Sequence, residues 1–225
     1  MSLTALGPNG TVLIARDVTK QDGPFRCSAC GSQMIVKKGL LKIAHFAHVS
    51  NTACEYGSGE SEEHLAAKMS IYDSLKKKGI NAILEKPLSP KVRADVLIEY
   101  PSGRKVAIEV QRSKMTREKC INRMLNYLET GVPVLWVLVR QIREGWNKVS
   151  QQEKFFHGIY FGKLVYFDQE SVLKVFTFSS RYRKTKREFS MIGKVDLANE
   201  GMFSVKRREE WRSLPAGLLW NPEVQ

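Results

Sequence analysis

The sequence predicts an α/β protein in which a mixed β-sheet is flanked by helices and preceded by a small segment carrying cysteine and histidine. Between residues 61 and 140, two helical patterns alternate with apolar runs of strand length. The run Val132–Val139 is continuously apolar, which is typical of a strand buried on both faces. Three of the four cysteines lie before residue 55, close to two histidines.

Composition points to a polyanionic partner. The chain has 225 residues, 43% of them apolar, which suits one moderately large domain or a domain with appendages. Its net charge of +13 and pI of about 9.7 favour nucleic acid. An anionic membrane surface is the weaker alternative, because no basic amphipathic helix stands out.

Nothing in the sequence indicates a membrane segment or secretion. No basic segment followed by a long apolar core begins the chain, and Val132–Val139 is its longest apolar run. Neither a signal peptide nor a membrane span is expected. Clustered cysteines indicate metal ligands in a reducing compartment, so we expect a cytoplasmic protein.

The first segment predicts a zinc site. After a strand over Val12–Arg16, Cys27 and Cys30 form a C-x-x-C pair that supplies half of a tetrahedral site. The other half must come from among His45, His48 and Cys54. We prefer Cys27, Cys30, His48 and Cys54, with His45 as a substitute. The alternative is a pair of reduced core cysteines. Four protein ligands would make the zinc structural.

A helix is predicted over Ser61–Lys78, after a flexible joint at Tyr56–Gly59. Ser61 suits the N-cap and Gly79 the C-terminal stop. Apolar residues recur every three to four positions and predict the buried face of the helix, which consists of Leu65, Met69, Tyr72 and Leu75. The acids at its start, Glu60, Glu62 and Glu63, complement the helix dipole. One turn apart, His64 and Lys68 share a face.

A strand over Asn81–Leu88 leads into a β-hairpin over Arg93–Arg112, with turn chemistry at Pro101–Gly103. Antiparallel pairing of its arms would bring Asp95 and Glu109 within reach of each other at the far end of the ladder. Two converging carboxylates repel each other unless a cation lies between them. Mg²⁺ or Mn²⁺ is the usual cation at such a site.

A second helix is predicted from Thr116 to Gly131, followed by the buried strand Val132–Val139. Connection through this helix makes the strand parallel to its neighbour. The expected buried face of the helix consists of Ile121, Met124, Leu125 and Leu128, with Arg123 and Tyr127 on another face.

Beyond Arg140, the runs Leu164–Phe167 and Val172–Phe178 predict a hairpin that either extends or covers the sheet. The stretch Arg181–Arg187 holds five basic residues and Tyr182, a pattern that can bind a phosphate backbone and stack on a base. A solvated surface is the alternative. The expected domains are a zinc-binding segment at 1–57, a core at 58–140 and an extension with a basic tail at 141–225.

Several of these motifs, in this order, resemble the competence protein CoiA family over Phe25–Leu138. They are Cys27-x-x-Cys30, His45-Phe-Ala-His48, Cys54, Glu60-Ser-x-Glu63-His64-Leu65-x-x-Lys68, Ala94-Asp95-Val96, Ile108-Glu109-Val110-Gln111 and Val134-Leu-Trp136-Val137. That family is similar to the PD-(D/E)XK nucleases. The resemblance implies a restriction-endonuclease-like core with Glu63, Asp95 and Glu109 in a metal site.

The lysine of the last nuclease motif falls at Gln111. A neutral amide can orient water or phosphate but cannot act as a general base. In this family pattern glutamine also replaces lysine. The missing charge would come from Lys68, Arg93 or Arg112.

The leading expectation is a Mg²⁺- or Mn²⁺-dependent deoxyribonuclease in DNA processing or recombination, of weak activity because of Gln111. In it Glu63, Asp95 and Glu109 bind metal, while Gln111 and Lys68 orient nucleophile and phosphate. The alternative is an inactive module that grips single-stranded or branched DNA and recruits recombination proteins. A third reading treats the two strand carboxylates as surface residues. Expected DNA-contacting residues are Arg93, Arg112, Arg181, Arg183, Lys184, Lys186 and Arg187.

Overall fold

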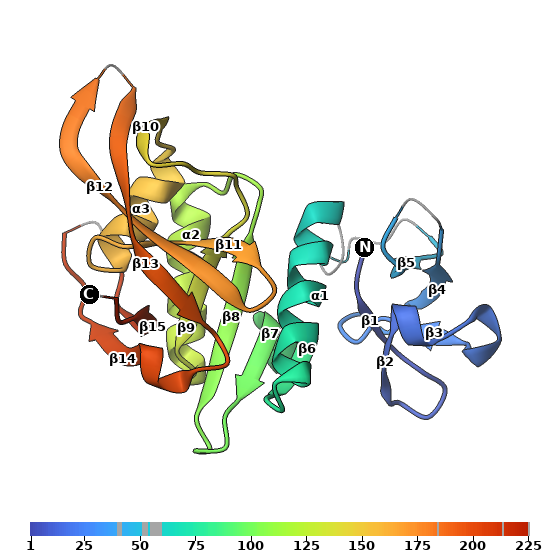
Figure 1. The fold of residues 1–225 in the computed structure, drawn as a ribbon. Helices are drawn as coiled ribbons and strands as arrows, with labels where there is room; N and C mark the ends of the chain where they lie inside the picture. Colours follow the sequence, from blue (N-terminus) through green and yellow to red (C-terminus); the bar gives the residue numbers. More distant parts are fainter. Residues whose placement is uncertain (40–41, 51–53, 55–59, 184, 213, 225) are drawn as a thin grey trace. The chain divides into compact units, whose positions relative to one another are not determined.

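The computed structural model describes residues 1–39, 42–50, 54, 60–183, 185–212 and 214–224. It divides into two compact units, Met1–Met69 and Ser70–Gln225 (Figure 1). Across the described residues, no helix has both the length and the apolar character needed to cross a membrane. The predicted joint at Tyr56–Gly59 lies outside the described residues.

The first unit contains a five-stranded antiparallel sheet in the order β2-β1-β3-β4-β5. Its elements are β1 (Thr4–Leu6), β2 (Val12–Ile14), 3-10 turns at Ala15–Asp17 and Lys20–Asp22, β3 (Phe25–Arg26), β4 (Gln33–Lys37) and β5 (His45–His48). Phe25 and Phe46 pack in its small core with ring centroids 5.0 Å apart. So few apolar residues are buried that a bound metal would add substantially to its stability.

The first helix, α1 (Glu62–Lys77), forms where the sequence predicts it. The His64 amide donates to Ser61 Oγ at 3.3 Å, and Gly79 ends the helix at φ +75°. Leu65 and Leu75 are fully buried as expected, and so is Ile71.

The second unit is built on a ten-stranded mixed sheet. Its order is β10-β13-β12-β11-β9-β8-β7-β6, and β15 pairs with both β9 and β14. The strands are β6 (Asn81–Ser89), β7 (Val92–Glu99), β8 (Lys105–Gln111), β9 (Val134–Leu138), β10 (Gly145–Lys148), β11 (Leu164–Gln169), β12 (Val172–Arg183), β13 (Lys186–Asp196), β14 (Phe203–Arg208) and β15 (Gly217–Pro222). A 3-10 turn spans Glu200–Met202. The predicted mixed α/β fold is confirmed.

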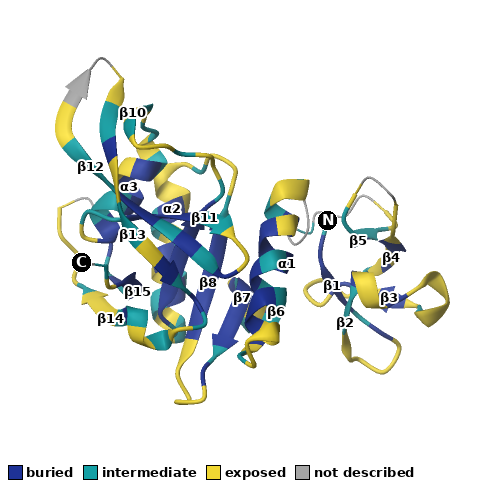
Figure 2. Cartoon of the chain, in the orientation of Figure 1, coloured by how far each residue is buried: buried dark blue, intermediate teal, exposed yellow. Residues whose placement is uncertain are grey.

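The predicted hairpin is present as β7 and β8, and its turn contains Gly103 at φ +84°. The next strand, β9, runs parallel to β8 through the crossover helix α2 (Arg117–Thr130). All five residues of β9 are buried, and most of β8 is dark blue in Figure 2. These two strands therefore form the centre of the core, as the apolar run at 132–139 predicts.

The buried face of α2 differs from the expected one. Thr116 caps the helix and Gly131 ends it as expected, but its buried residues are Cys120, Met124 and Tyr127. Leu125 is 39% exposed. Of the predicted face, Met124 is buried and Ile121 and Leu128 are half-buried. Only Leu125 was wrong, because apolar spacing took no account of the buried carboxylate of Glu109, which holds Tyr127 toward the sheet.

Strands beyond residue 140 belong to this same sheet. The predicted hairpin at Leu164–Phe178 forms β11 and β12, and it extends the sheet because β11 pairs parallel with β9. Helix α3 (Gln151–Ile159) contacts both β11 and α2, and its Phe156 stacks on Trp136 of β9 with centroids 5.0 Å apart. The domain boundaries at 57 and 140 remain predictions.

Candidate functional site

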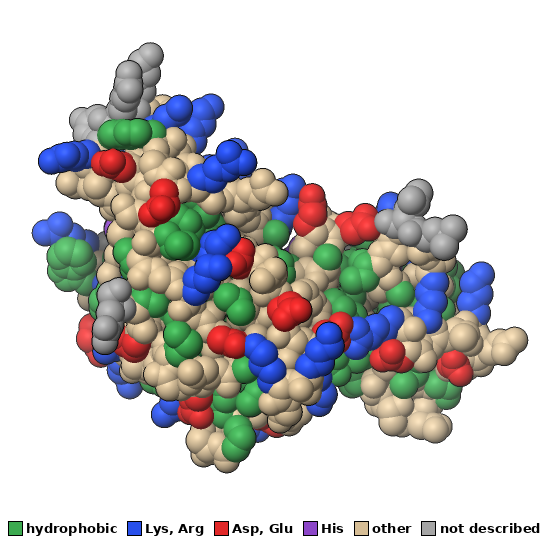
Figure 3. All heavy atoms as spheres, in the orientation of Figure 1, with side chains coloured by type: hydrophobic (Ala, Val, Ile, Leu, Met, Phe, Trp, Pro, Cys, Tyr) green, Lys and Arg blue, Asp and Glu red, His purple; other side chains and the backbone are tan. Residues whose placement is uncertain are grey.

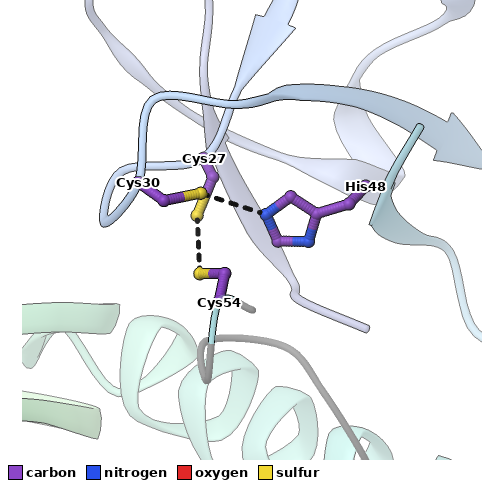
Figure 4. A group of neighbouring side chains, drawn as sticks. All are labelled: Cys27, Cys30, His48 and Cys54. Atoms are coloured by element: carbon purple, nitrogen blue, oxygen red, sulfur yellow. Dashed lines mark hydrogen bonds between the residues drawn. The ribbon is translucent and has the colours of Figure 1, made fainter. Parts of the chain in front are cut away.

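A group of four side chains in the first unit could hold a metal ion. The ligand atoms of Cys27, Cys30, His48 and Cys54 all lie within 4.8 Å of one another (Figure 4). Among the residues that the structure describes, no other group of three or more His, Cys, Asp or Glu side chains has its ligand atoms this close together. Three thiolates and one imidazole match the ligands of a closed tetrahedral zinc site. These are the four residues the sequence analysis preferred.

Local structure explains how the four meet. Cys27 follows β3, and a turn closed by the Gly31 amide donating to the Cys27 carbonyl at 2.9 Å brings Cys30 back beside it. Gly31 has φ +70°, a conformation that glycine adopts without strain. His48 ends β5, where it pairs with Met34 of β4, and Met34 in turn pairs with Phe25 of β3. Sheet register therefore carries the histidine to the C-x-x-C turn.

The electrostatics of this group suit metal binding. The thiol of Cys30 lies 3.4 Å from His48 Nε2, and the Sγ atoms of Cys27 and Cys54 are 3.9 Å apart. A hydrogen bond with Ser32 is the main reason that the pKa of Cys30 falls to about 6. His45 is not in the group: it is buried, and its Nδ1 lies 2.9 Å from the Ile43 carbonyl.

The two strand carboxylates meet at the end of the β7–β8 ladder. The last described pair is Val96 with Ile108, and continuing that register by one residue sets Asp95 opposite Glu109. Asp95 Oδ2 accepts a hydrogen bond from the Val110 amide at 2.9 Å. Asp95 is 8% exposed and Glu109 is fully buried.

Sequence reasoning did not assign the two residues that hold Glu109. From α2, Arg123 donates to Glu109 Oε2 and the Tyr127 hydroxyl donates to Oε1. Arg123 also lies over the Trp136 ring, 5.0 Å from its centroid. The i, i+4 spacing of an arginine and a tyrosine after an acidic strand was the available signal.

Charge in this site is strongly coupled. Although 42% of the Arg123 side chain is exposed, its partial burial disfavours the cation; attraction to Glu109, and then to Asp95, outweighs that effect and raises the pKa of Arg123. Burial, and then the neighbouring Glu109 charge, raises the pKa of Tyr127 well above its ordinary value. The phenol therefore remains a hydrogen-bond donor at neutral pH. A cation between the carboxylates was expected, and Arg123 already supplies one.

The predicted residues of α1 belong to the first unit. Lys68 is fully buried, and its Nζ lies 2.9 Å from Glu60 Oε2. Glu63 is exposed. Asp95, Glu109 and Gln111 belong to the second unit, so a site that joins them to Glu63 and Lys68 stays a prediction.

The other predicted residues near the carboxylates differ in exposure. Gln111 donates its side-chain amide to the Ser113 carbonyl. Arg93 is largely buried and lies 3.7 Å from Glu85. Arg112 is exposed.

The predicted basic run forms the outer end of the β12–β13 hairpin. Arg181 and Lys186 are exposed, and Arg187 donates to the Ser180 carbonyl. Arg183 pairs with Lys186 in the strand register, and Lys184 lies outside the described residues. Figure 3 shows Lys and Arg side chains around this end of the hairpin. DNA contact by these residues remains a prediction.

The chain is similar to known proteins over most of its length. Residues 60–199 match the nuclease-like domain of competence protein CoiA, and residues 14–57 match its N-terminal domain. Competence protein CoiA of Bacillus subtilis (strain 168) is 30% identical over 116 residues, a match that covers 51% of this chain and 31% of that protein. No solved structure matches the chain significantly.

The two family matches together cover both the four-residue metal group and the pair of strand carboxylates. The resemblance inferred from the motifs is thereby confirmed. The chain belongs to the competence protein CoiA family.

Proposed function

We propose that this protein is a divalent-metal-dependent deoxyribonuclease that hydrolyses phosphodiester bonds in DNA processing or recombination. The observation that carries the proposal is the position of Asp95 and Glu109 just beyond the last register pair of adjacent strands, inside the region that matches a nuclease-like domain. A net charge of +13 suits a phosphate-rich substrate.

The residues fit a hard divalent cation. Carboxylate oxygens on neighbouring strands are the donors that Mg²⁺ and Mn²⁺ prefer, and the guanidinium on Glu109 marks a place that already holds positive charge. Asp95 and Glu109 would hold the ion, with Glu63 as a third carboxylate. When bound, the ion lowers the pKa of its water and neutralises charge on phosphate oxygens.

The chain's own residues would orient the reactants. The Val110 amide fixes Asp95, and Tyr127 fixes Glu109. Gln111 is neutral and would orient water or a phosphate oxygen through its amide. The Arg123 side chain is 42% exposed. It can therefore reach a phosphate while it neighbours Glu109, and it supplies the positive charge that Gln111 lacks. Lys68 is a second source of that charge.

The four-residue group of the first unit would hold a structural zinc ion. Its ligands are Cys27, Cys30, His48 and Cys54, and a set of four protein ligands leaves no open position for a substrate. This zinc would stabilise the small sheet, and the chemistry would take place at the strand carboxylates.

Cleavage of labelled single-stranded, duplex and branched DNA with Mn²⁺ tests the activity. The wild-type protein should cut, and the Asp95→Asn and Glu109→Gln variants should each fail to cut. Asp168→Asn is the matched control, because Asp168 pairs with Lys174 at 2.6 Å elsewhere on the sheet. If wild type cuts none of these substrates faster than Asp95→Asn does, the enzyme claim fails.

One observation favours a second function, an inactive DNA-binding module that recruits recombination proteins. Both oxygens of Glu109 already have donors, and the Gln111 amide is bonded to the backbone of Ser113. DNA binding by wild type and by Asp95→Asn with equal affinity, without cutting by either, would support this function over the first.

A further inference from the structure

The strands β10, β13 and the end of β12 form a three-stranded edge of the large sheet. Trp146, Asn147 and Lys148 of β10 pair with Glu188, Arg187 and Lys186 of β13, respectively. On its other side β13 pairs with β12, where Arg183 takes the register position opposite Lys186. We call the surface formed by Trp146, Lys148 and Lys186 the ribbon face.

Two lysines lie directly opposite each other on the ribbon face. Side chains of directly opposed residues share a face of the sheet, and like charges in such a pair destabilise it. Lys148 and Lys186 are both exposed, and within the described part of the chain neither makes an ion pair. Several other cationic side chains of this unit have acidic partners, such as Lys174 and Lys194 on Asp168. An anionic ligand would relieve the repulsion between the two lysines.

A tryptophan accompanies these lysines. Trp146 is 41% exposed, and because it precedes Lys148 by two positions on one strand, both side chains lie on the same face. An exposed indole ring beside paired ammonium groups combines a stacking surface with phosphate contacts. Glu188, opposite Trp146, is the one acidic residue in the β10–β13 pairing, so the anion would be held at the lysine end.

We propose that the ribbon face binds single-stranded DNA, with Lys148 and Lys186 on the phosphate backbone and Trp146 stacked on a base. The choice of DNA rests on the proposed function. A single strand is favoured over a duplex because bases inside a duplex stack on each other and offer no free face to an indole ring. An acidic protein surface would satisfy the lysines but would leave the ring unused. This face would hold the strand while the carboxylates act on it.

Binding of a fluorescein-labelled single-stranded oligonucleotide, followed by anisotropy in EDTA, tests the proposal without cleavage. Trp146→Ala should weaken binding about tenfold, while Trp146→Phe keeps a stacking ring and most of the affinity. Trp211→Ala is the matched control, because Trp211 is 56% exposed and lies outside the ribbon face.

The lysines are tested through the salt dependence of the same binding. The double variant Lys148→Gln/Lys186→Gln should lower the slope of log K against log salt by about 1.4, the value for two phosphate contacts to a single strand. The double variant Lys91→Gln/Lys105→Gln removes the same charge from lysines that pair with Glu129 and Glu99. Its slope should equal that of wild type.

Three outcomes would overturn the proposal. The first is that the two double lysine variants lower the salt slope equally. The second is that Trp146→Ala and Trp211→Ala weaken single-strand binding equally. The third is that the ribbon variants lose as much affinity for duplex DNA or single-stranded RNA as for single-stranded DNA. Loss of cleavage does not bear on it: a wild type that never cuts but loses single-strand binding in the ribbon variants supports this proposal and refutes the nuclease. If wild type cuts DNA but the ribbon variants bind single strands as well as wild type does, the nuclease is supported and this proposal is refuted.

Discussion

Tyr127 on α2 donates its hydroxyl hydrogen bond to Glu109 on β8, at the centre of the large sheet. Glu109 is fully buried, so it has no water to solvate its charge and depends on Tyr127 and Arg123. The contact joins the crossover helix to the strand that carries the central acid of the candidate site. It therefore affects stability and activity together.

Removing the Tyr127 hydroxyl should destabilise the protein. Tyr127→Phe leaves one oxygen of a buried carboxylate without its donor, which costs about 1–3 kcal/mol in free energy of unfolding. Urea denaturation measures this loss. In a Glu109→Gln background the same substitution should cost less, because the acceptor is no longer charged. Equal costs in both backgrounds would show that the hydroxyl does not act through Glu109.

The metal group predicts about one zinc ion per chain in protein purified without added zinc. Cys27→Ser and His48→Asn should each lose the metal, as measured by elemental analysis, and the unfolding temperature should fall with it. Cys120→Ser should keep the metal, because Cys120 is buried in α2 and burial raises its pKa to about 11. His45→Asn should keep it as well. Zinc retained in His48→Asn and lost in His45→Asn would reverse the assignment of the histidine ligand.

Substitutions of the two acids Glu60 and Glu63 at the start of α1 should have different effects on stability and cleavage. Glu60→Gln removes a carboxylate that lies 2.9 Å from the fully buried Lys68 ammonium and should lower the free energy of unfolding by about 1–3 kcal/mol. Glu63→Gln changes an exposed residue and should shift stability by no more than about 0.5 kcal/mol. If Glu63 helps to hold the catalytic ion, its variant loses cleavage without losing stability. A stable, fully active Glu63→Gln protein would remove it from the site.

His157 on α3 should make stability depend on pH. Its ring stacks on Phe178 with centroids 3.8 Å apart, and burial lowers its pKa from 6.5 to about 4. Above pH 6.5 the residue is neutral in both states. As the pH falls from 6.5 toward 4, the unfolded chain binds a proton that the folded chain does not, so the free energy of unfolding decreases.

The comparison between wild type and His157→Phe isolates this effect. The unfolding temperature of wild type should fall more between pH 7 and pH 4.5 than that of the variant, since both proteins share their other titrating groups. The same fall in both proteins would mean that His157 is protonated in the folded state.

Elements with strong local signals could be predicted from the sequence. The β7–β8 hairpin followed from its turn residues and its apolar arms, and the approach of Asp95 to Glu109 followed from the register that such a turn imposes. The C-x-x-C turn limited the metal ligands to a few candidates, and the choice of His48 over His45 agrees with the structure.

What escaped prediction depends on contacts between distant segments. The partners of Glu109 lie on the following helix, and spacing alone could not show that a buried charge would hold Tyr127 on the inner face in place of Leu125. In the same way, the motif contains both Glu60 and Glu63 and assigns Glu63 to the site, but it could not show that Lys68 forms an ion pair with Glu60. The facing lysines of the ribbon face arise from strand register, which a linear scan for basic runs does not reveal.

The central strand β9 has a parallel partner on each side at its first residue. There Val134 pairs with Leu219 of β15, and Ala107 of β8 lies on the other side. During translation β8 and β9 emerge early, and β11 later covers the Leu138 end of this edge, yet its Val134 end stays open until β15 has left the ribosome. An unpaired apolar edge invites association with other chains. A fragment cut at residue 199, where the nuclease-like match ends, would keep the Val134 end of that edge open permanently.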